Sequence, residues 1–164
     1  MNQIDAAIDV IMDDDVDADL PNQQNIESAV RLACKTATKN ILAPHVCIRF
    51  AHDKAVQELN AQWRNKDSVT DVLSFPMQEG DMYTADEPLG DIVLAVPFIL
   101  HEAQRLQREP HAHILHLIIH GMLHLLGHDH IHDDEAHTMQ SLESRIMKEL
   151  HLHQPYPDEI SDHA

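Results

Sequence analysis

One stretch of the chain restricts the fold more than any other, because it is apolar on almost every side of a helix. Between Pro110 and Gly127 the apolar residues leave almost no polar face: Ile114, Leu115, Leu117, Ile118, Met122, Leu123 and Leu125. A helix of that kind has to be buried by other elements. Proline is accepted in the first turn of a helix and glycine favours its end, so we expect it to begin near Pro110 and stop at Gly127.

The other elements follow from the spacing of apolar residues. Spacings of three and four predict helices over 22–41, 53–64, about 98–108 and about 133–150, with Asp53 as the N-cap of the second. Strand-like composition or alternation marks 3–11, 46–50, 69–75 and 90–95. A chain of 164 residues has the length of one domain. We therefore expect residues 1–164 to form a single α+β domain, a mixed sheet of about four strands packed by about five helices.

Two segments fall outside these elements, and the chain as a whole is acidic. Residues 13–21 are expected to form an acidic loop and 152–164 a polar tail. The formal net charge is −17, which by itself argues against a general nucleic-acid surface. Residues 22–75 differ, because seven basic against five acidic side chains give that segment a charge of +2.

The cysteine content and the N-terminal sequence bear on the compartment. Cys34 and Cys47 are the two cysteines, and they do not form a C-x-x-C pair, so a disulfide scaffold or thiolate metal site is not expected. The N-terminal residues lack the basic start and apolar run of a signal peptide, and no apolar run is long enough to span a bilayer. We therefore expect a reducing cytoplasm.

Three histidines near the end of the buried helix have a spacing that suits a metal ion. His120 and His124 are four residues apart and share one helical face, so both imidazoles can reach one ion. Gly127 permits the chain to reverse, after which His130 can supply a third nitrogen. Three protein ligands plus water form a catalytic arrangement. We therefore predict a three-histidine metal site here, with His128 as a weaker candidate for the third ligand.

The remaining histidines of this region have simpler interpretations. Ten of the fifteen histidines lie between residues 101 and 137. His116 shares a helical face with His120 but lies one turn deeper, so we expect it in the core or behind a metal ligand. We expect the following to be surface residues: His101, His111, His113, His132 and His137.

The ligand spacing equals that of metzincin proteases, whose signature is H-E-x-x-H-x-x-G-x-x-H. The glutamate that serves those enzymes as general base is replaced here by Gly121. Peptide hydrolysis by their mechanism therefore has no obvious base, although a metallopeptidase-like hydrolase remains an alternative.

Three motifs follow one another between residues 59 and 130. The first comprises Leu59-Asn60, Trp63-Arg64 and residues 70–76, the second is Gly90-Asp91-Ile92, and the third is the histidine segment 120–130. Together they resemble the motifs of the YbeY endoribonucleases, also described as rRNA maturation factors, whose signature H-G-x-L-H-L-x-G-x-D-H residues 120–130 match at every fixed position. The expected order of elements is compatible with this family over most of the chain.

The resemblance implies a zinc-dependent, single-strand-specific endoribonuclease of the cytoplasm that acts in rRNA maturation and ribosome quality control. It implies one zinc ion held by His120, His124 and His130, with a water on the ion attacking the phosphodiester. It makes Arg64 the residue needed for activity, and a guanidinium suits phosphate oxygens. The implied partners are single-stranded or ribosomal RNA, and ribosomal small-subunit proteins or assembly factors.

Some features stay open at this point. The general base is unassigned among Asp91, Asp71 and His128. The basic residues spaced along the first helix are either a surface for RNA backbone or a solvated face: Arg31, Lys35 and Lys39. A metal-binding ribosome-assembly factor without catalysis is a further alternative.

Overall fold

A computed structural model describes residues 7–37, 44–78, 87–128 and 132–156. Within these ranges the chain forms one mixed four-stranded sheet and five helices, which confirms the predicted α+β class. The strands are β1 Ala7–Met12, β2 His45–Ala51, β3 Val72–Pro76 and β4 Gly90–Ala95. The helices are α1 Gln23–Ala37, α2 Asp53–Arg64, α3 Val96–Leu106, α4 Pro110–Leu125 and α5 Asp133–Glu149.

The sheet has the strand order β1-β2-β4-β3. Strands β1, β2 and β4 are parallel, and β3 runs antiparallel to β4, with Ser74 opposite Ile92. Alternate residues of β2 are buried in the main core, namely Val46, Ile48 and Phe50. This is the period-two pattern expected of a strand with a buried face.

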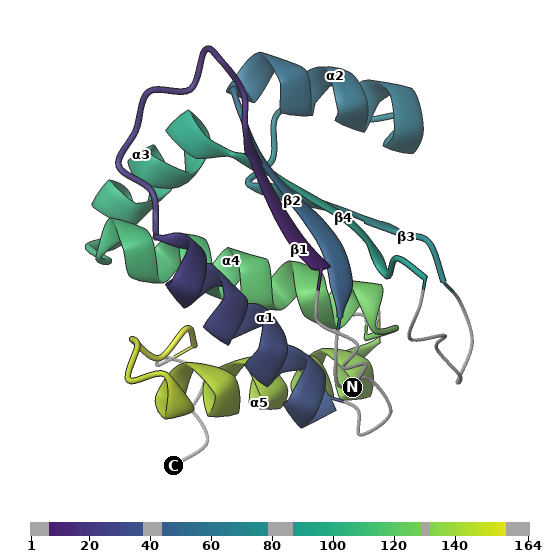
Figure 1. The fold of residues 1–164 in the computed structure, drawn as a ribbon, viewed down its shortest axis with the longest axis vertical. Helices are drawn as coiled ribbons and strands as arrows, with labels where there is room; N and C mark the ends of the chain where they lie inside the picture. Colours follow the sequence, from purple (N-terminus) through teal and green to yellow (C-terminus); the bar gives the residue numbers. More distant parts are fainter. Residues whose placement is uncertain (1–6, 38–43, 79–86, 129–131, 157–164) are drawn as a thin grey trace, which may run out of the picture.

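The helices cover the two faces of the sheet unequally. Figure 1 shows α2 on one face and α1, α4 and α5 on the other. The larger core cluster joins the second group of helices to the sheet, and a smaller one lies beneath α2 around Val56 and Leu73. Helix α4 lies between the sheet and α1 and α5, and Ile114, Ile118 and Leu123 on it have no exposed surface. The helix that is apolar on almost every side is thus largely buried, as predicted.

The element boundaries differ from the expectation in two instructive places. His52, not Asp53, is the N-cap of α2, so the predicted cap is wrong by one residue. The Asp53 carboxylate instead accepts a hydrogen bond from the backbone N–H of Phe98 at 3.0 Å, at the start of α3. Strand β3 begins at Val72 rather than residue 69, and the Asp71 carboxylate accepts from the Val72 N–H at 2.7 Å.

The two segments expected to lack regular structure both contact the body of the protein. In the 13–21 segment, Asp13 accepts two hydrogen bonds from the Arg49 guanidinium at 2.9 and 2.7 Å. In the C-terminal segment, Pro155 is buried and its carbonyl accepts from Arg108 at 2.9 Å. Residues 152–156 therefore pack against the fold, while 157–164 lie outside the described residues. Among the described helices, none has the length and apolar character needed to cross a membrane.

Candidate active site

A groove of about 900 Å³ lies where three elements meet. The C-terminal end of α2 contributes Asn60 and Arg64, the segment before and along β3 contributes residues 68–74, and the end of α4 contributes His120 and His124. Residues from motifs that are far apart in the chain, such as Arg64 and His120, thereby line one cavity.

His120 and His124 present their imidazoles to each other at the groove. Their Nε2 atoms are 3.1 Å apart. Two imidazoles bound at about 2.0–2.1 Å to one tetrahedral zinc ion have donor nitrogens roughly 3.3 Å apart, so this pair has the spacing of metal ligands. Helix α4 ends at Leu125, and Gly127 has a φ of 93°, which permits the predicted reversal of the chain. His130 lies outside the described residues, so the third predicted ligand stays a prediction.

A carboxylate that the sequence analysis missed stands behind His120. Glu143 of α5 has no exposed surface, and its carboxylate accepts from His120 Nδ1 and, at 2.5 Å, from the Tyr156 hydroxyl. Because an ionised carboxylate only accepts hydrogen bonds, Nδ1 of His120 carries a proton. In the neutral imidazole, Nε2 then holds the lone pair toward the groove, as in carboxylate–histidine–metal arrangements.

The charge state of Glu143 follows from its neighbours. Burial works to raise the pKa of Glu143, but the imidazoles of His116 and His120 outweigh it and lower the pKa to about 2. The carboxylate is therefore ionised at neutral pH. The sequence did carry a signal for it: Glu143 lies four residues after Met139 and three before Ile146, on the buried stripe of α5.

Arg64 lies in the last turn of α2 and is held across β3. One Nη2–H donates to the Ser74 carbonyl at 2.5 Å, and the guanidinium carbon lies 5.5 Å from the centre of the Phe75 ring. Arg64 lines the groove. A guanidinium has five N–H donors in a planar fork, so this anchoring still leaves donors for a bound anion.

Two of the three candidate bases line the groove. Asp71 and His128 do so, whereas Asp91 on β4 is not among the described residues that line it. Burial, reinforced by the charge of Glu102, raises the pKa of Asp71. Burial lowers the pKa of His128 and keeps its imidazole neutral at physiological pH. The structure thus favours Asp71 and His128 over Asp91.

Gly121, which stands where metzincin proteases have their catalytic glutamate, packs closely against the sheet. A Cβ on Gly121 would lie 3.0 Å from Ile92 Cγ2 and 3.1 Å from Ser74 Oγ. A glutamate at this position would be directed into the sheet rather than toward the groove. The packing of α4 on β3 and β4 therefore accounts for Gly121 and disfavours the metallopeptidase alternative.

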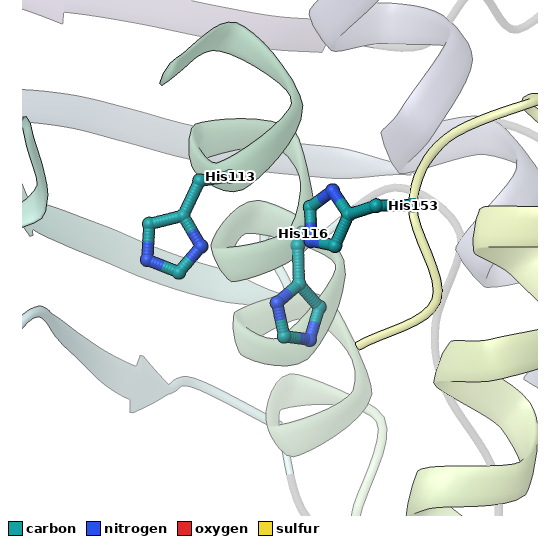
Figure 2. A group of neighbouring side chains, drawn as sticks. All are labelled: His113, His116 and His153. Atoms are coloured by element: carbon teal, nitrogen blue, oxygen red, sulfur yellow. The ribbon is translucent and has the colours of Figure 1, made fainter. Parts of the chain in front are cut away.

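A second group of histidines could bind a metal ion, two of them on α4 and one on the segment after α5: His113, His116 and His153 (Figure 2). His116 is 5% exposed, in agreement with its expected place in the core. His113 is 2% exposed, so the prediction that it lies on the surface is wrong. His113 is buried because other elements pack around almost all of α4.

The basic residues of α1 do not belong to the groove. Arg31 and Lys35 are exposed, and Lys39 lies outside the described residues. Helix α1 packs against α4 and α5, whereas the groove is lined by α2, the β3 region and the end of α4. The basic residues of α1 are therefore not part of the groove, and RNA binding along this helix stays a prediction.

Comparison with known proteins agrees with the motifs. The family model described as endoribonuclease YbeY matches residues 11–151. A protein named endoribonuclease YbeY from Rhizobium etli is 44% identical over 118 residues, 70% of this chain and 68% of the relative. One from Pseudomonas putida is 41% identical over 137 residues, 83% of this chain and 87% of the relative.

A solved structure shows the same fold. The solution structure of a protein from Thermotoga maritima has a TM-score of 0.56 at 23% identity, covering 88% of this chain and 91% of its own. The match of the family model to residues 11–151 and the 44% identity to the Rhizobium etli relative show that the chain belongs to the YbeY endoribonuclease family.

Proposed function

We propose that this protein is a zinc-dependent, single-strand-specific endoribonuclease that acts in rRNA maturation and ribosome quality control. The observation that carries the proposal is the pair His120 and His124, with Nε2 atoms 3.1 Å apart, facing a groove that Arg64 also lines. The names of the relatives support RNA as the substrate.

The donor set fits a zinc ion. His120 is oriented by Glu143, His124 shares its helical face, and the turn at Gly127 leads toward His130, the proposed third ligand. Imidazole nitrogens suit zinc, and a three-histidine site keeps a position open for chemistry. When bound, zinc would lower the pKa of a water molecule toward about 7 and polarise a phosphoryl oxygen.

Residues of the groove bind the phosphate and accept the proton. Arg64, fixed by the Ser74 carbonyl, binds the phosphate and stabilises the negative charge that gathers on its oxygens during cleavage. His128, neutral at physiological pH, or Asp71 accepts the proton of the attacking water. Asp71, from the segment before β3, and His128, just after the end of α4, both line the groove that contains the histidine pair.

The proposed compartment and protein partners rest on two further features. Cys34 and Cys47 are both free thiols, which suits a reducing cytoplasm. The net charge of −17 suits basic partners such as ribosomal small-subunit proteins or assembly factors.

The test is cleavage of a labelled, structured rRNA fragment by highly purified protein, with zinc measured in every sample. The variants are His124→Ala, Arg64→Ala and, as a matched control, Arg145→Ala on the exposed face of α5. We expect His124→Ala to lose both zinc and cleavage, Arg64→Ala to keep zinc but lose cleavage at least 100-fold, and the control to behave as wild type.

The opposite outcomes identify the alternatives. Equal cleavage by all four preparations would point to a contaminating ribonuclease and favour a metal-binding assembly factor without catalysis. Zinc-dependent cleavage of a peptide panel with no action on RNA would favour a peptidase-like hydrolase.

A further inference from the structure

Three imidazoles meet beside α4, one helical turn before His120 of the groove. His113 and His116 are three residues apart and share one face of the helix, and His153 approaches from the segment after α5 (Figure 2). The ring centroids are 6.2, 6.4 and 6.1 Å apart, so they form a nearly equilateral triangle.

The nitrogen positions are close to those of a metal centre. One nitrogen from each ring lies within 4.8 Å of the other two. Points within that distance of one another all lie within about 2.8 Å of a common centre, whereas zinc–imidazole bonds are about 2.0–2.1 Å long. A shift of less than about 1 Å per ring would complete the coordination, and His153 belongs to a non-helical segment that can supply it.

The same nitrogens have no hydrogen-bond partner, although they are buried. This holds for Nδ1 of His113 and for both ring nitrogens of His116 and of His153. Nε2 of His116 is 3.6 Å from the Glu143 carboxylate, which is beyond a hydrogen bond. Buried polar atoms are normally paired, so this concentration of unpaired imidazole nitrogens points to a ligand that accepts their lone pairs.

The surroundings match those of a metal-binding histidine. Nε2 of His113 is 2.7 Å from a Glu102 carboxylate oxygen, which fixes the ring and directs Nδ1 toward the other two imidazoles. Glu102 and Glu143 supply negative charge beside the cluster. Burial lowers the pKa of His113, and burial and the charge of Arg108 lower that of His153 to about 4, so both rings are neutral, as ligands must be.

We propose that His113, His116 and His153 form a second metal site, for a borderline divalent ion such as Zn²⁺, that fastens the C-terminal segment to α4. A small cavity of about 200 Å³ lined by His113, His116 and Arg108 gives the ion a route from solvent. The fastened segment also carries Tyr156, whose hydroxyl donates to Glu143. The proposal does not depend on the proposed nuclease activity.

The test counts metal ions with the groove site disabled. His124→Ala protein is stripped with a chelator and titrated with Co²⁺ or Zn²⁺ alone, with bound metal measured after gel filtration and Co²⁺ followed by its visible absorption. We expect one tightly bound equivalent per chain, and a tetrahedral Co²⁺ spectrum. Adding His153→Gln should weaken that binding at least 100-fold, and zinc should no longer raise the melting temperature of the double variant.

The matched control is His151→Gln, an exposed histidine two residues away in the same segment. It should leave the equivalent in place. Circular dichroism verifies folding, and His113→Gln serves as the second ligand variant should His153→Gln not fold. The proposal is overturned if His124→Ala protein binds no tight equivalent, if loss of His153 or His113 leaves binding unchanged, or if His151→Gln weakens binding equally, which would indicate surface chelation only.

Discussion

The replacement Glu143→Gln tests whether the buried carboxylate orients His120 for a metal ion. The side chain keeps its shape but loses its charge in a site with no solvent exposure. The carboxylate accepts charge-assisted hydrogen bonds from His120 Nδ1 and the Tyr156 hydroxyl. In glutamine the amide oxygen can still accept from His120, but the amide NH2 can only donate, to the Tyr156 oxygen, so both bonds become neutral and one reverses. Each such change removes about 1–1.5 kcal/mol, so the free energy of unfolding should fall by about 2–3 kcal/mol.

Glu143→Gln should also weaken zinc binding, and by more than the variant Tyr156→Phe does. Changes to carboxylates behind a metal-bound histidine weaken metal affinity about 10- to 100-fold. Tyr156→Phe removes one hydrogen bond but leaves the carboxylate on His120, so we expect a loss of about 1 kcal/mol in stability and less than about tenfold in affinity. Urea unfolding of chelator-treated protein measures the first quantity, and competition with a fluorescent zinc chelator measures the second.

The matched control is Glu149→Gln on the exposed face of the same helix, which should change stability by less than about 0.5 kcal/mol and leave zinc affinity unaltered. The reasoning is refuted if Glu143→Gln loses the expected stability but binds zinc as tightly as wild type. The carboxylate would then serve the packing of α5 and not the metal site.

Three further predictions concern single positions. Gly121→Ala should lower the free energy of unfolding by about 1 kcal/mol in urea titrations, because overpacking against the sheet outweighs the gain in helix propensity. Burial raises the pKa of Cys34 to about 12, so mass spectrometry after iodoacetamide treatment of native protein should show modification of half-buried Cys47 and none of Cys34. The hydrogen bonds from Arg49 lower the pKa of Asp13 below its ordinary 3.8, so the ion pair stabilises the fold above that pH and the contribution disappears as pH falls through the lowered value. Asp13→Asn should therefore be less stable than wild type by about 0.5 kcal/mol at pH 7, and the difference should vanish in acid unfolding series.

Much of the fold could be predicted because its signals are local. The stretch that is apolar on almost every side predicted α4, and the alternation around Ile48 predicted β2. The pair His120 and His124 needed only the helical period to be placed on one face. Gly127 marked the end of the helix, since a φ of 93° is open to glycine.

What could not be predicted depends on contacts between distant parts of the chain. Glu143 reaches His120 across 23 residues, and Tyr156 reaches Glu143 from the C-terminal segment. The sequence alone favours the surface for His113, yet in the structure its buried imidazole is 2.7 Å from the Glu102 carboxylate of the preceding helix. In each case the missing information was the packing of α3 or α5 against α4, which periodicity within one element does not contain.

The position of the candidate site at the end of α4 has an electrostatic reason. The C-terminal end of a helix carries partial negative charge and favours cations, and His124 lies in its last turn. Glu143 and, at the groove wall, Asp71 add carboxyl groups nearby. Such a place repels a phosphodiester unless positive charge is brought to it. Arg64 from α2 supplies one such charge and, under the proposed function, a metal ion on the histidine pair would supply another, so we expect phosphate to bind more weakly when either is removed.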